Sequence, residues 1–444
     1  MNKYERYKST ELSWSKHLPY YWNIKRIASI FDIRKEKNSP VRTKEILSLS
    51  AKYGVSLYSD KKEKGGNKPK EDLTSYYLCY SGDILVNCMN IVAGSVGISN
   101  YFGAVSPIYY PLLNMNADEN CTQYMEYVFR NYNFQRSLVG LGKGIQMSES
   151  EDGKLFTVRM RISWDILKTQ LLPVPPIEEQ VQIANYLDWK INEIDRLIQI
   201  EKEKIKQLNQ TMQISINSRY KILNLEDETN KGVKIKYLAN QITQHKGEYR
   251  RYIALENIIS QKGMMKISFD NLEFNSDGIS VEKNMVIFGK LRPYLAKTIV
   301  VENKAVCSSE FLVLNPIKLM PLYLKYLMLS SKFIDLVDSS TYGTKMPRAN
   351  SDFILNLKIV VPDLSEQKKV VEKILESENR INKVIEVIIK KIESMENLKQ
   401  SLISEVVTGQ IDVRDIVIPE YEKVAIADGE IEETDEMEGK EYGN

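Results

Sequence analysis

The sequence predicts an α+β protein in which two similar mixed α/β domains alternate with two long helices. Three observations support this fold class: a proline-rich strap leading into a helix occurs twice, each helix carries a narrow apolar stripe, and a large body of sequence precedes each copy. The helices are expected to pack as an antiparallel coiled coil, which gives a pseudo-twofold internal repeat. The expected segments are a first domain at 1–175, a first long helix at 176–224, a second domain at 225–362, a second long helix at 363–411 and an acidic, disordered tail at 412–444.

The repeat is clearest where each long helix begins. The segment "PVPPIEEQ" ends at Gln180 and "VVPDLSEQ" ends at Gln367, and the same offset of 187 residues pairs Pro175 with Pro362. Prolines hold the backbone extended, and the acidic residues after them place negative charge in the first helical turn, where it is favourable. We therefore expect a helix to start directly after each strap.

Weaker similarity extends upstream of the straps. The segment "GDILVN" from Gly82 is similar to "NMVIFG" from Asn284, and "KRIASIF" from Lys25 is similar to "KYLANQI" from Lys236. The offset changes between these points, as expected for duplicated domains whose loops differ in length.

Each long helix has apolar residues at alternating steps of three and four, which is the heptad pattern of a helix-helix seam. Glu201, Glu378 and Lys399 interrupt the pattern as polar residues. Long helices with one narrow stripe are unstable alone, so the two stripes should bury each other. The predicted seam comprises Leu187, Ile194, Ile198, Ile205, Leu208, Ile374, Ile381, Ile385, Ile388, Ile392, Met395 and Leu402.

The charge of the chain is unevenly distributed. The formal net charge is +2, but residues 412–444 hold twelve acidic and three basic residues, which leaves +11 on residues 1–411. A basic body fits a polyanionic partner such as DNA. The tail either solubilises the protein or competes with a polyanion for the basic body.

The cysteines and the hydropathy pattern indicate a cytoplasmic protein. Cys79, Cys88, Cys121 and Cys307 show no C-x-x-C spacing and no neighbouring histidine cluster, so neither a disulfide framework nor a structural zinc site is expected. No run approaches the roughly 20 apolar residues that span a bilayer, and the start has no apolar block of signal length. No membrane association and no metal are expected.

At the straps the sequence resembles the specificity subunits of type I restriction-modification enzymes. The resemblance covers residues from about 15 to 415 and is carried by "PVPPIEEQVQIANYLD", "VVPDLSEQKKVVEKIL", "LKQSLISEVVTGQIDV", "FGKLRPYLAK" and "HLPYYWNIKRIASI". It implies that each domain is a target recognition domain for one half of a split, asymmetric DNA site, with the helices setting the gap between the halves.

The resemblance also implies partners and cofactors. Such a host-defence subunit is not catalytic, binds double-stranded DNA, and docks two methyltransferase subunits and two motor-nuclease restriction subunits. S-adenosylmethionine, ATP and Mg are then expected on those partners, and no cofactor on this chain.

The sequence contains little that points to chemistry of its own. The glycine cluster "GLGKG" from Gly140 lacks the Lys-Ser/Thr of a phosphate-binding loop and the surrounding strand-to-helix pattern. Two alternatives remain open at this point: a coiled-coil scaffold without DNA binding, and a self-sufficient methyltransferase or nuclease.

Contacts to DNA require side chains that reach base edges or phosphates, chiefly Arg, Lys, Asn and Gln. Loops dense in these residues are therefore the candidates, although each residue could instead be a solvated charge or a turn former. The candidates are Asn87, Asn90, Lys143 and Gln146 in the first domain, and Lys290, Arg292, Tyr294, Lys297, Lys345, Arg348 and Asn350 in the second.

Overall fold

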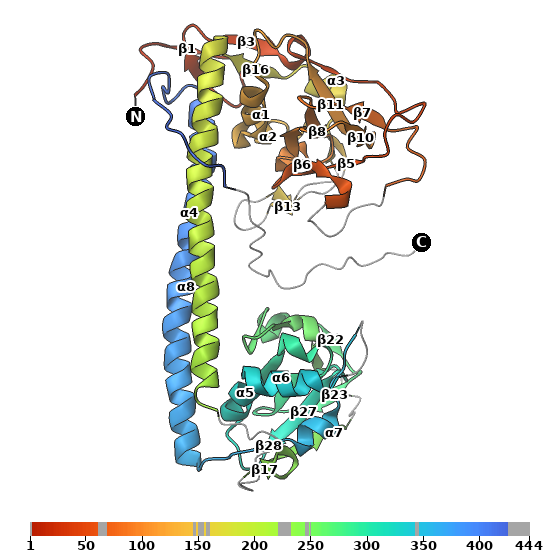
Figure 1. Ribbon diagram of the computed structural model, residues 1–444, viewed down its shortest axis with the longest axis vertical. Helices are drawn as coiled ribbons and strands as arrows, with labels where there is room; N and C mark the ends of the chain where they lie inside the picture. The colour runs from red at the N-terminus through yellow and green to blue at the C-terminus, as the bar shows by residue number, and fades with distance from the viewer. Residues whose placement is uncertain are drawn as a thin grey trace. The chain divides into compact units, whose positions relative to one another are not determined.

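The computed structural model describes residues 2–60, 69–144, 148–149, 155–156, 160–220, 232–244, 248, 250–341 and 346–424. The chain divides into two compact units. The first unit combines Met1–Ile198 with Ile392–Ala427, and the second combines Gln199–Lys391 with Asp428–Asn444. Each unit holds one mixed α/β domain and a part of two long helices, α4 (Ile177–Asn217) and α8 (Leu364–Val407) (Figure 1). The mixed α/β class that the sequence predicted is confirmed.

A four-stranded antiparallel sheet forms the centre of the first domain. Its strand order is β4 (Phe31–Ile33), β11 (Tyr109–Asn114), β8 (Ile84–Asn87) and β9 (Val96–Ile98). The apolar run from Ile84 to Val86 is fully buried, as expected for a continuous apolar strand at the centre of a domain. The helix α1 (Thr122–Arg130) covers this sheet, and the Phe129 and Phe31 rings lie 6.1 Å apart.

The remaining elements of the first domain are short. They are β1 (Tyr7–Ser9), β2 (His17–Pro19), β3 (Asn23–Arg26), η1 (Ile27–Ser29), β5 (Leu47–Ser50), β6 (Gly54–Leu57), η2 (Tyr58–Asp60), β7 (Tyr77–Cys79), η3 (Ile91–Ala93), β10 (Gly103–Val105), α2 (Tyr132–Ser137), β12 (Lys143–Gly144), β13 (Ser148–Glu149), β14 (Leu155–Phe156), β15 (Met160–Arg161), α3 (Trp164–Leu167) and β16 (Leu171–Val174).

The second domain has a sheet with the same order of equivalent strands. The order is β18 (Ala239–Ile242), β27 (Phe311–Pro316), β24 (Val286–Gly289) and β25 (Thr298–Val300). The strands β8 and β24 start at residues 84 and 286, and β9 and β25 at 96 and 298, so both pairs show the 202-residue offset of the Gly82 and Asn284 segments. The sequence similarity between those two segments therefore reflects equivalent strands.

The remaining elements of the second domain are again short. They are β17 (Val233–Lys234), η4 (Ile235–Tyr237), β19 (Arg250–Ile253), η5 (Leu255–Asn257), β20 (Ile258–Ile259), β21 (Met264–Met265), η6 (Phe269–Asn271), β22 (Phe274–Asn275), β23 (Ile279–Val281), η7 (Pro293–Leu295), β26 (Ala305–Cys307), α5 (Pro321–Leu329), α6 (Ser331–Ser339), α7 (Ser351–Asn356) and β28 (Lys358–Ile359).

The alignment of Lys25 with Lys236 was wrong by three residues. The elements η1 and η4 are equivalent, because each follows a strand that pairs with the strand before a strap: β3 pairs with β16, and β17 with β28. Ile27 therefore corresponds to Ile235, and both are fully buried. The two lysines are not buried, so packing does not constrain their positions.

The glutamine of the first strap joins the helix start to the domain. The Gln180 side chain is fully buried; its Nε2 donates to the carbonyls of Pro175 (2.8 Å) and Glu119 (2.9 Å). Its Oε1 accepts from the backbone N–H of Cys121, the residue before α1, at 2.8 Å. One side chain thus satisfies three backbone groups, which is how a buried amide is stabilised.

The glutamine of the second strap makes the equivalent contacts. The Nε2 of Gln367 donates to the carbonyls of Pro362 (3.0 Å) and Lys318 (3.4 Å), and its Oε1 accepts from the N–H of Met320 at 2.8 Å. Met320 precedes α5 as Cys121 precedes α1. The repeated glutamine therefore has the same structural role in both copies.

The two helix starts differ in how they are capped. At Pro176 the chain has no side-chain cap, and its carbonyl accepts from Gln180 N at 2.9 Å. At the equivalent position, the Asp363 carboxylate accepts from the Glu366 N–H at 2.9 Å and from the Ser365 hydroxyl at 2.7 Å. These hydrogen bonds lower the pKa of Asp363. The aspartate thus caps the second helix where the first has a proline.

The N-terminal segment covers the start of α4 in the first unit. Glu179 is buried and accepts hydrogen bonds from the Tyr4 hydroxyl, the Tyr21 hydroxyl (3.0 Å) and the Trp22 indole N–H (3.1 Å). Burial and the bond to this carboxylate raise the pKa of Tyr21 to about 12. The equivalent Glu366 is exposed, so this contact belongs to the first copy alone.

The apolar stripe of the two long helices is largely buried within each unit. Buried members of the predicted seam are Leu187, Ile194, Ile198, Ile205, Ile374, Ile385, Ile388, Ile392 and Leu402, whereas Leu208, Ile381 and Met395 are partly buried.

The three polar interruptions of the stripe have partners. In the first unit, Lys399 Nζ lies 2.7 Å from Asp195 Oδ1. In the second unit, Glu201 Oε1 lies 2.7 Å from Lys391 Nζ, and Glu378 accepts a hydrogen bond from a tyrosine hydroxyl of α5. Two of the interruptions are therefore ion pairs that join α4 to α8.

Both long helices end before the predicted residues 224 and 411. The helix α4 ends at Asn217, and Tyr220 turns into the second domain, where its buried hydroxyl donates to a carbonyl of α5 at 2.9 Å. The helix α8 ends at Val407 because Gly409 has a left-handed φ of 66°. A Cβ at Gly409 would lie 2.4 Å from Pro19 Cγ, so glycine is also required for space.

The expected disorder of 412–444 was wrong for residues 412–424, which the structure describes. Val413 is fully buried, and its carbonyl and that of Ile416 accept hydrogen bonds from Gln182 at 2.9 and 2.7 Å. Charge counted over the whole tail concealed this short apolar segment. Residues 425–444 lie outside the described residues.

The cysteines behave as small core residues. Cys79, Cys88 and Cys307 are buried, Cys121 is half-buried, and all four are free thiols. Burial raises the pKa of Cys79 and of Cys307 to about 12, so both thiols stay protonated. Within the described ranges, the structure contains no helix with the length and apolarity to cross a membrane.

Candidate nucleic-acid interface

Two loops of the second domain that carry predicted residues lie side by side. The first connects β24 to β25 through η7, and the second runs from Met346 to Asn350. The N–H of Arg292 donates to the Pro347 carbonyl at 2.8 Å, and the N–H of Ala349 donates to the Lys290 carbonyl at 2.9 Å. The fold thus brings together candidates that are far apart in the sequence.

The side chains of this loop pair differ in their availability. Arg292 and Tyr294 are exposed and Lys290 is partly buried, so these can reach a ligand. Lys297 is buried, with 7% of its surface exposed. Asn350 is exposed, but its Oδ1 accepts from the Asp352 N–H at 2.8 Å and caps α7. Lys345 lies outside the described residues.

Arg348 is held by a carboxylate. Its Nε and Nη2 lie 3.0 and 2.7 Å from the two oxygens of Glu310, which is a two-pronged geometry. This interaction raises the pKa of the Arg348 guanidinium. A phosphate or a base would have to compete with Glu310 for Arg348.

The first domain contains the equivalent loop between β8 and β9. The Cys88 carbonyl accepts from the Ile162 N–H at 2.9 Å, as the Lys290 carbonyl does from Ala349. Asn90 is exposed on this loop. Asn87 is buried, and its Oδ1 accepts from the Met89 N–H at 3.0 Å, so its side chain holds the turn.

Of the candidates at residues 143 and 146, the first lies in the short strand β12. The backbone of Lys143 pairs with Arg161 between β12 and β15, but its side chain is outside the described part of the structure. Gln146 lies outside the described residues altogether. The pairing nevertheless places the predicted Lys143 segment beside the β8–β9 loop region.

Arg161 is a candidate that the sequence analysis missed. It is exposed, and the neighbouring Tyr110 hydroxyl raises the pKa of its guanidinium. The 187-residue offset of the straps also pairs Arg161 with Arg348. Extending the strap offset upstream by 14 residues from Pro175 would have found it.

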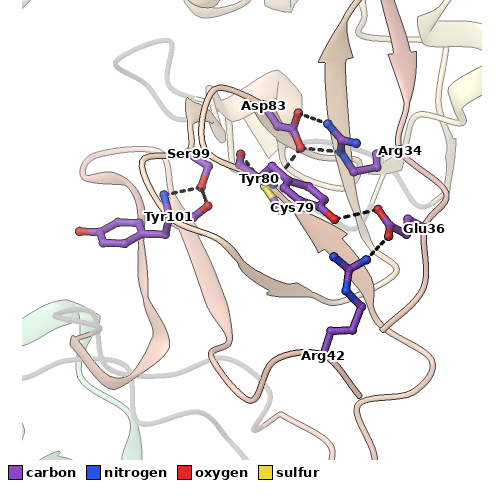
Figure 2. A network of polar contacts seen from close by, with 8 residues as sticks. All are labelled: Arg34, Glu36, Arg42, Cys79, Tyr80, Asp83, Ser99 and Tyr101. Carbon is purple, nitrogen blue, oxygen red and sulfur yellow. Dashed lines mark hydrogen bonds and ion pairs between the residues drawn. The ribbon is translucent and has the colours of Figure 1, made fainter. Parts of the chain in front are cut away.

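A second cluster in the first domain joins basic and aromatic side chains (Figure 2). Arg34 contacts both oxygens of Asp83 at 2.9 and 3.0 Å, and its guanidinium lies 4.4 Å from the centroid of the Tyr80 ring. The Tyr80 hydroxyl donates to Glu36 at 3.0 Å, and Glu36 also pairs with Arg42. Asp83 is nearly fully buried, so the Arg34–Asp83 pair holds the turn before β8 and is not a free binding group.

The second unit also contains a cavity of about 590 Å³ between the domain and α8. Its lining includes Lys325, Tyr326 and Glu378. Lys325 is buried, which lowers its pKa, and its ammonium lies 4.1 Å from the centroid of the Tyr326 ring. None of the predicted DNA contacts lines this cavity.

The chain is similar in sequence to type I restriction specificity proteins. Residues 214–394 match a family model described as the type I restriction modification DNA specificity domain. The chain is 24% identical over 277 residues to the type I restriction enzyme MjaVIII specificity subunit of Methanocaldococcus jannaschii; the match covers 55% of this chain and 63% of that protein. It is 23% identical over 140 residues to the type I restriction enzyme EcoDI specificity subunit of Escherichia coli, covering 30% of this chain and 31% of that one. These matches span less than two thirds of either relative.

A solved structure has a similar fold. It comes from work on complex assembly and conformational transition of the type I R-M system, with a TM-score of 0.63 and 12% identity, and covers 89% of this chain and 99% of that chain. At this identity the similarity concerns the fold.

Proposed function

We propose that this chain, which belongs to the family of type I restriction-modification specificity subunits, is the DNA-reading component of a restriction-modification complex. It recognises a split, asymmetric double-stranded target, one half with each domain, and is not itself catalytic. The observation that carries the proposal is the duplicated sheet order, with an Asn- or Arg-bearing loop at the same place in each copy. Methyltransferase and motor-nuclease subunits supply the chemistry and its cofactors.

The long helices act as a ruler in this proposal. They pair antiparallel as a coiled coil, and a pseudo-twofold axis relates the two copies. Support comes from two ion pairs that join α4 to α8, Asp195–Lys399 in the first unit and Glu201–Lys391 in the second. The later residue of α4 pairs with the earlier residue of α8, as an antiparallel pair requires. The predicted seam is also largely buried.

A binding selection tests the proposed DNA reading. The full-length chain is incubated with a pool of duplexes that carry a long random segment, and bound DNA is sequenced. The proposal expects a two-part motif with an unread gap, and binding that weakens steeply with salt as phosphate contacts are lost. A coiled-coil scaffold that does not bind DNA would return the starting pool at every salt concentration.

A matched insertion tests the ruler. One heptad inserted into both helices at the level of the Glu201–Lys391 pair keeps the seam in register and lengthens it by about 10 Å. At about 3.4 Å per base pair, the unread gap should grow by about three base pairs. The control is the same heptad in α4 alone, which breaks the register. An unchanged gap with a folded double-insertion variant would refute the ruler.

A further inference from the structure

In each sheet, a loop connects the third and fourth strands in the sheet order. At one equivalent position of this loop the two domains carry different side chains. Each loop contains a short 3-10 helix, η3 in the first domain and η7 in the second, and the residues directly before these helices are Asn90 and Arg292. The strands on both sides share the 202-residue offset, so the correspondence does not depend on local sequence similarity.

The loops also end alike. The residue after each 3-10 helix is left-handed: Gly94 has a φ of 82° and Ala296 a φ of 46°. Arg292 is left-handed as well, with φ 51° and ψ 63°, whereas Asn90 has φ −125°. Left-handed backbone at residues with side chains is disfavoured and is concentrated at functional sites. In the second domain the fold therefore holds Arg292 in a left-handed backbone conformation that is intrinsically unfavourable for arginine.

Both side chains are available to a ligand. Asn90 and Arg292 are exposed. Among the residues that the structure describes, neither the Asn90 carboxamide nor the Arg292 guanidinium has a hydrogen-bond or ion-pair partner, in contrast to Arg348 beside Glu310. An exposed carboxamide and an exposed guanidinium at equivalent points are suited to different bases. Asn pairs in two-pronged fashion with adenine, and Arg with the O6 and N7 of guanine.

We propose that this loop position reads one base in each half of the DNA target, with Asn90 reading an adenine and Arg292 a guanine. The proposal rests on the proposed function and adds which residues distinguish the two half-sites. Arg161 and Arg348, which lie beside these loops, then position the DNA.

Reciprocal exchange of the two side chains tests the assignment. Full-length Asn90→Arg and Arg292→Asn are each taken through the random-duplex selection beside the wild-type chain. Asn90→Arg should change one position of one half-site from adenine to guanine, and Arg292→Asn should make the opposite change in the other half. The expected reversal of preference is about 5- to 150-fold, the range of one two-pronged base contact. The control is Asn397→Arg, which adds the same charge at an exposed position of α8.

If an exchange variant binds DNA too weakly for selection, alanine variants test the same assignment. Asn90→Ala and Arg292→Ala should each lose base preference at a single position and retain the rest of the motif. Wild-type chain that selects no motif would overturn the proposed function. If the wild-type chain selects a motif and both exchange variants select the same motif, the base assignment is wrong while the proposed function stands. The same holds if the alanine variants lose base preference at every position of the motif or at none.

Discussion

The structural role of the buried strap glutamines can be tested by measuring how much each one contributes to the unfolding free energy of its unit. Gln180→Ala removes three hydrogen bonds, of 2.8, 2.8 and 2.9 Å, and leaves their backbone partners without the buried amide. At about 1 kcal/mol for each hydrogen bond, we expect the first unit to lose about 3 kcal/mol of unfolding free energy. Gln367→Ala removes two bonds of normal length and one of 3.4 Å, so about 2 kcal/mol should be lost from the second unit.

The tryptophans separate these two effects. The chain has four, Trp14, Trp22, Trp164 and Trp189, and all lie in the first unit. Urea unfolding followed by tryptophan fluorescence therefore reports the first unit, and circular dichroism reports both. Gln180→Ala should shift the fluorescence transition, and Gln367→Ala should shift circular dichroism with little change in fluorescence. The control is Gln400→Ala, at an exposed position of α8. If Gln180→Ala were no more destabilising than this control, the structural reason given for the strap motif would be wrong.

Four further predictions concern individual contacts. Asp83→Ala leaves the Arg34 guanidinium unpaired beside a buried turn, so fluorescence-detected stability should fall by about 3 kcal/mol; a loss no larger than that of exposed Asp165→Ala would contradict it. Gly409→Ala should destabilise the first unit by at least about 1 kcal/mol, because φ is 66° and the added Cβ meets Pro19; an unchanged urea midpoint would argue against that packing. Lys391, and after it Lys204, lower the pKa of Glu201. The ionised Glu201 therefore stabilises the folded state fully above the ordinary carboxyl pKa, and this stabilisation is lost as the pH falls through the lowered pKa. Unfolding curves of wild type and Glu201→Gln should accordingly differ at pH 7 and converge in acid, and a constant difference would refute the pairing. Glu310→Gln releases Arg348, so binding to the selected duplex should strengthen, measured by fluorescence anisotropy against Glu302→Gln as the matched control; weaker binding would show that Glu310 orients Arg348 for the DNA.

Much of the fold was predictable because its signals are local or periodic. The helix starts after both straps follow from proline geometry, and the seam follows from heptad spacing, since each depends on residues within a few turns of one another. The 202-residue offset between the Gly82 and Asn284 segments was visible because central strands must be apolar. By contrast, the second requirement for glycine at residue 409 is the lack of space beside Pro19, which is nearly 400 residues away in the chain.

The candidate site was predictable only in part. Residue type selected Arg292 and Asn90, which are exposed, but it also selected Asn87 and Lys297, which are buried. Arg161 was missed because only its correspondence to Arg348 through the strap offset marks it, and that offset was not extended so far upstream. Composition describes what a side chain can do, whereas its exposure and partners depend on segments that approach it from elsewhere.

The sequence by itself determined the duplicated layout, the long helices with their apolar stripe and the basic character of the body. These properties reside in spacing and charge, which do not depend on how distant segments meet. Only the tertiary structure decided that the Arg292 and Arg348 loops lie together, that Glu310 holds Arg348, and that each strap glutamine binds the residue before a domain helix. Each of those contacts joins segments far apart in the chain, and their approach is set by the packing of the whole domain.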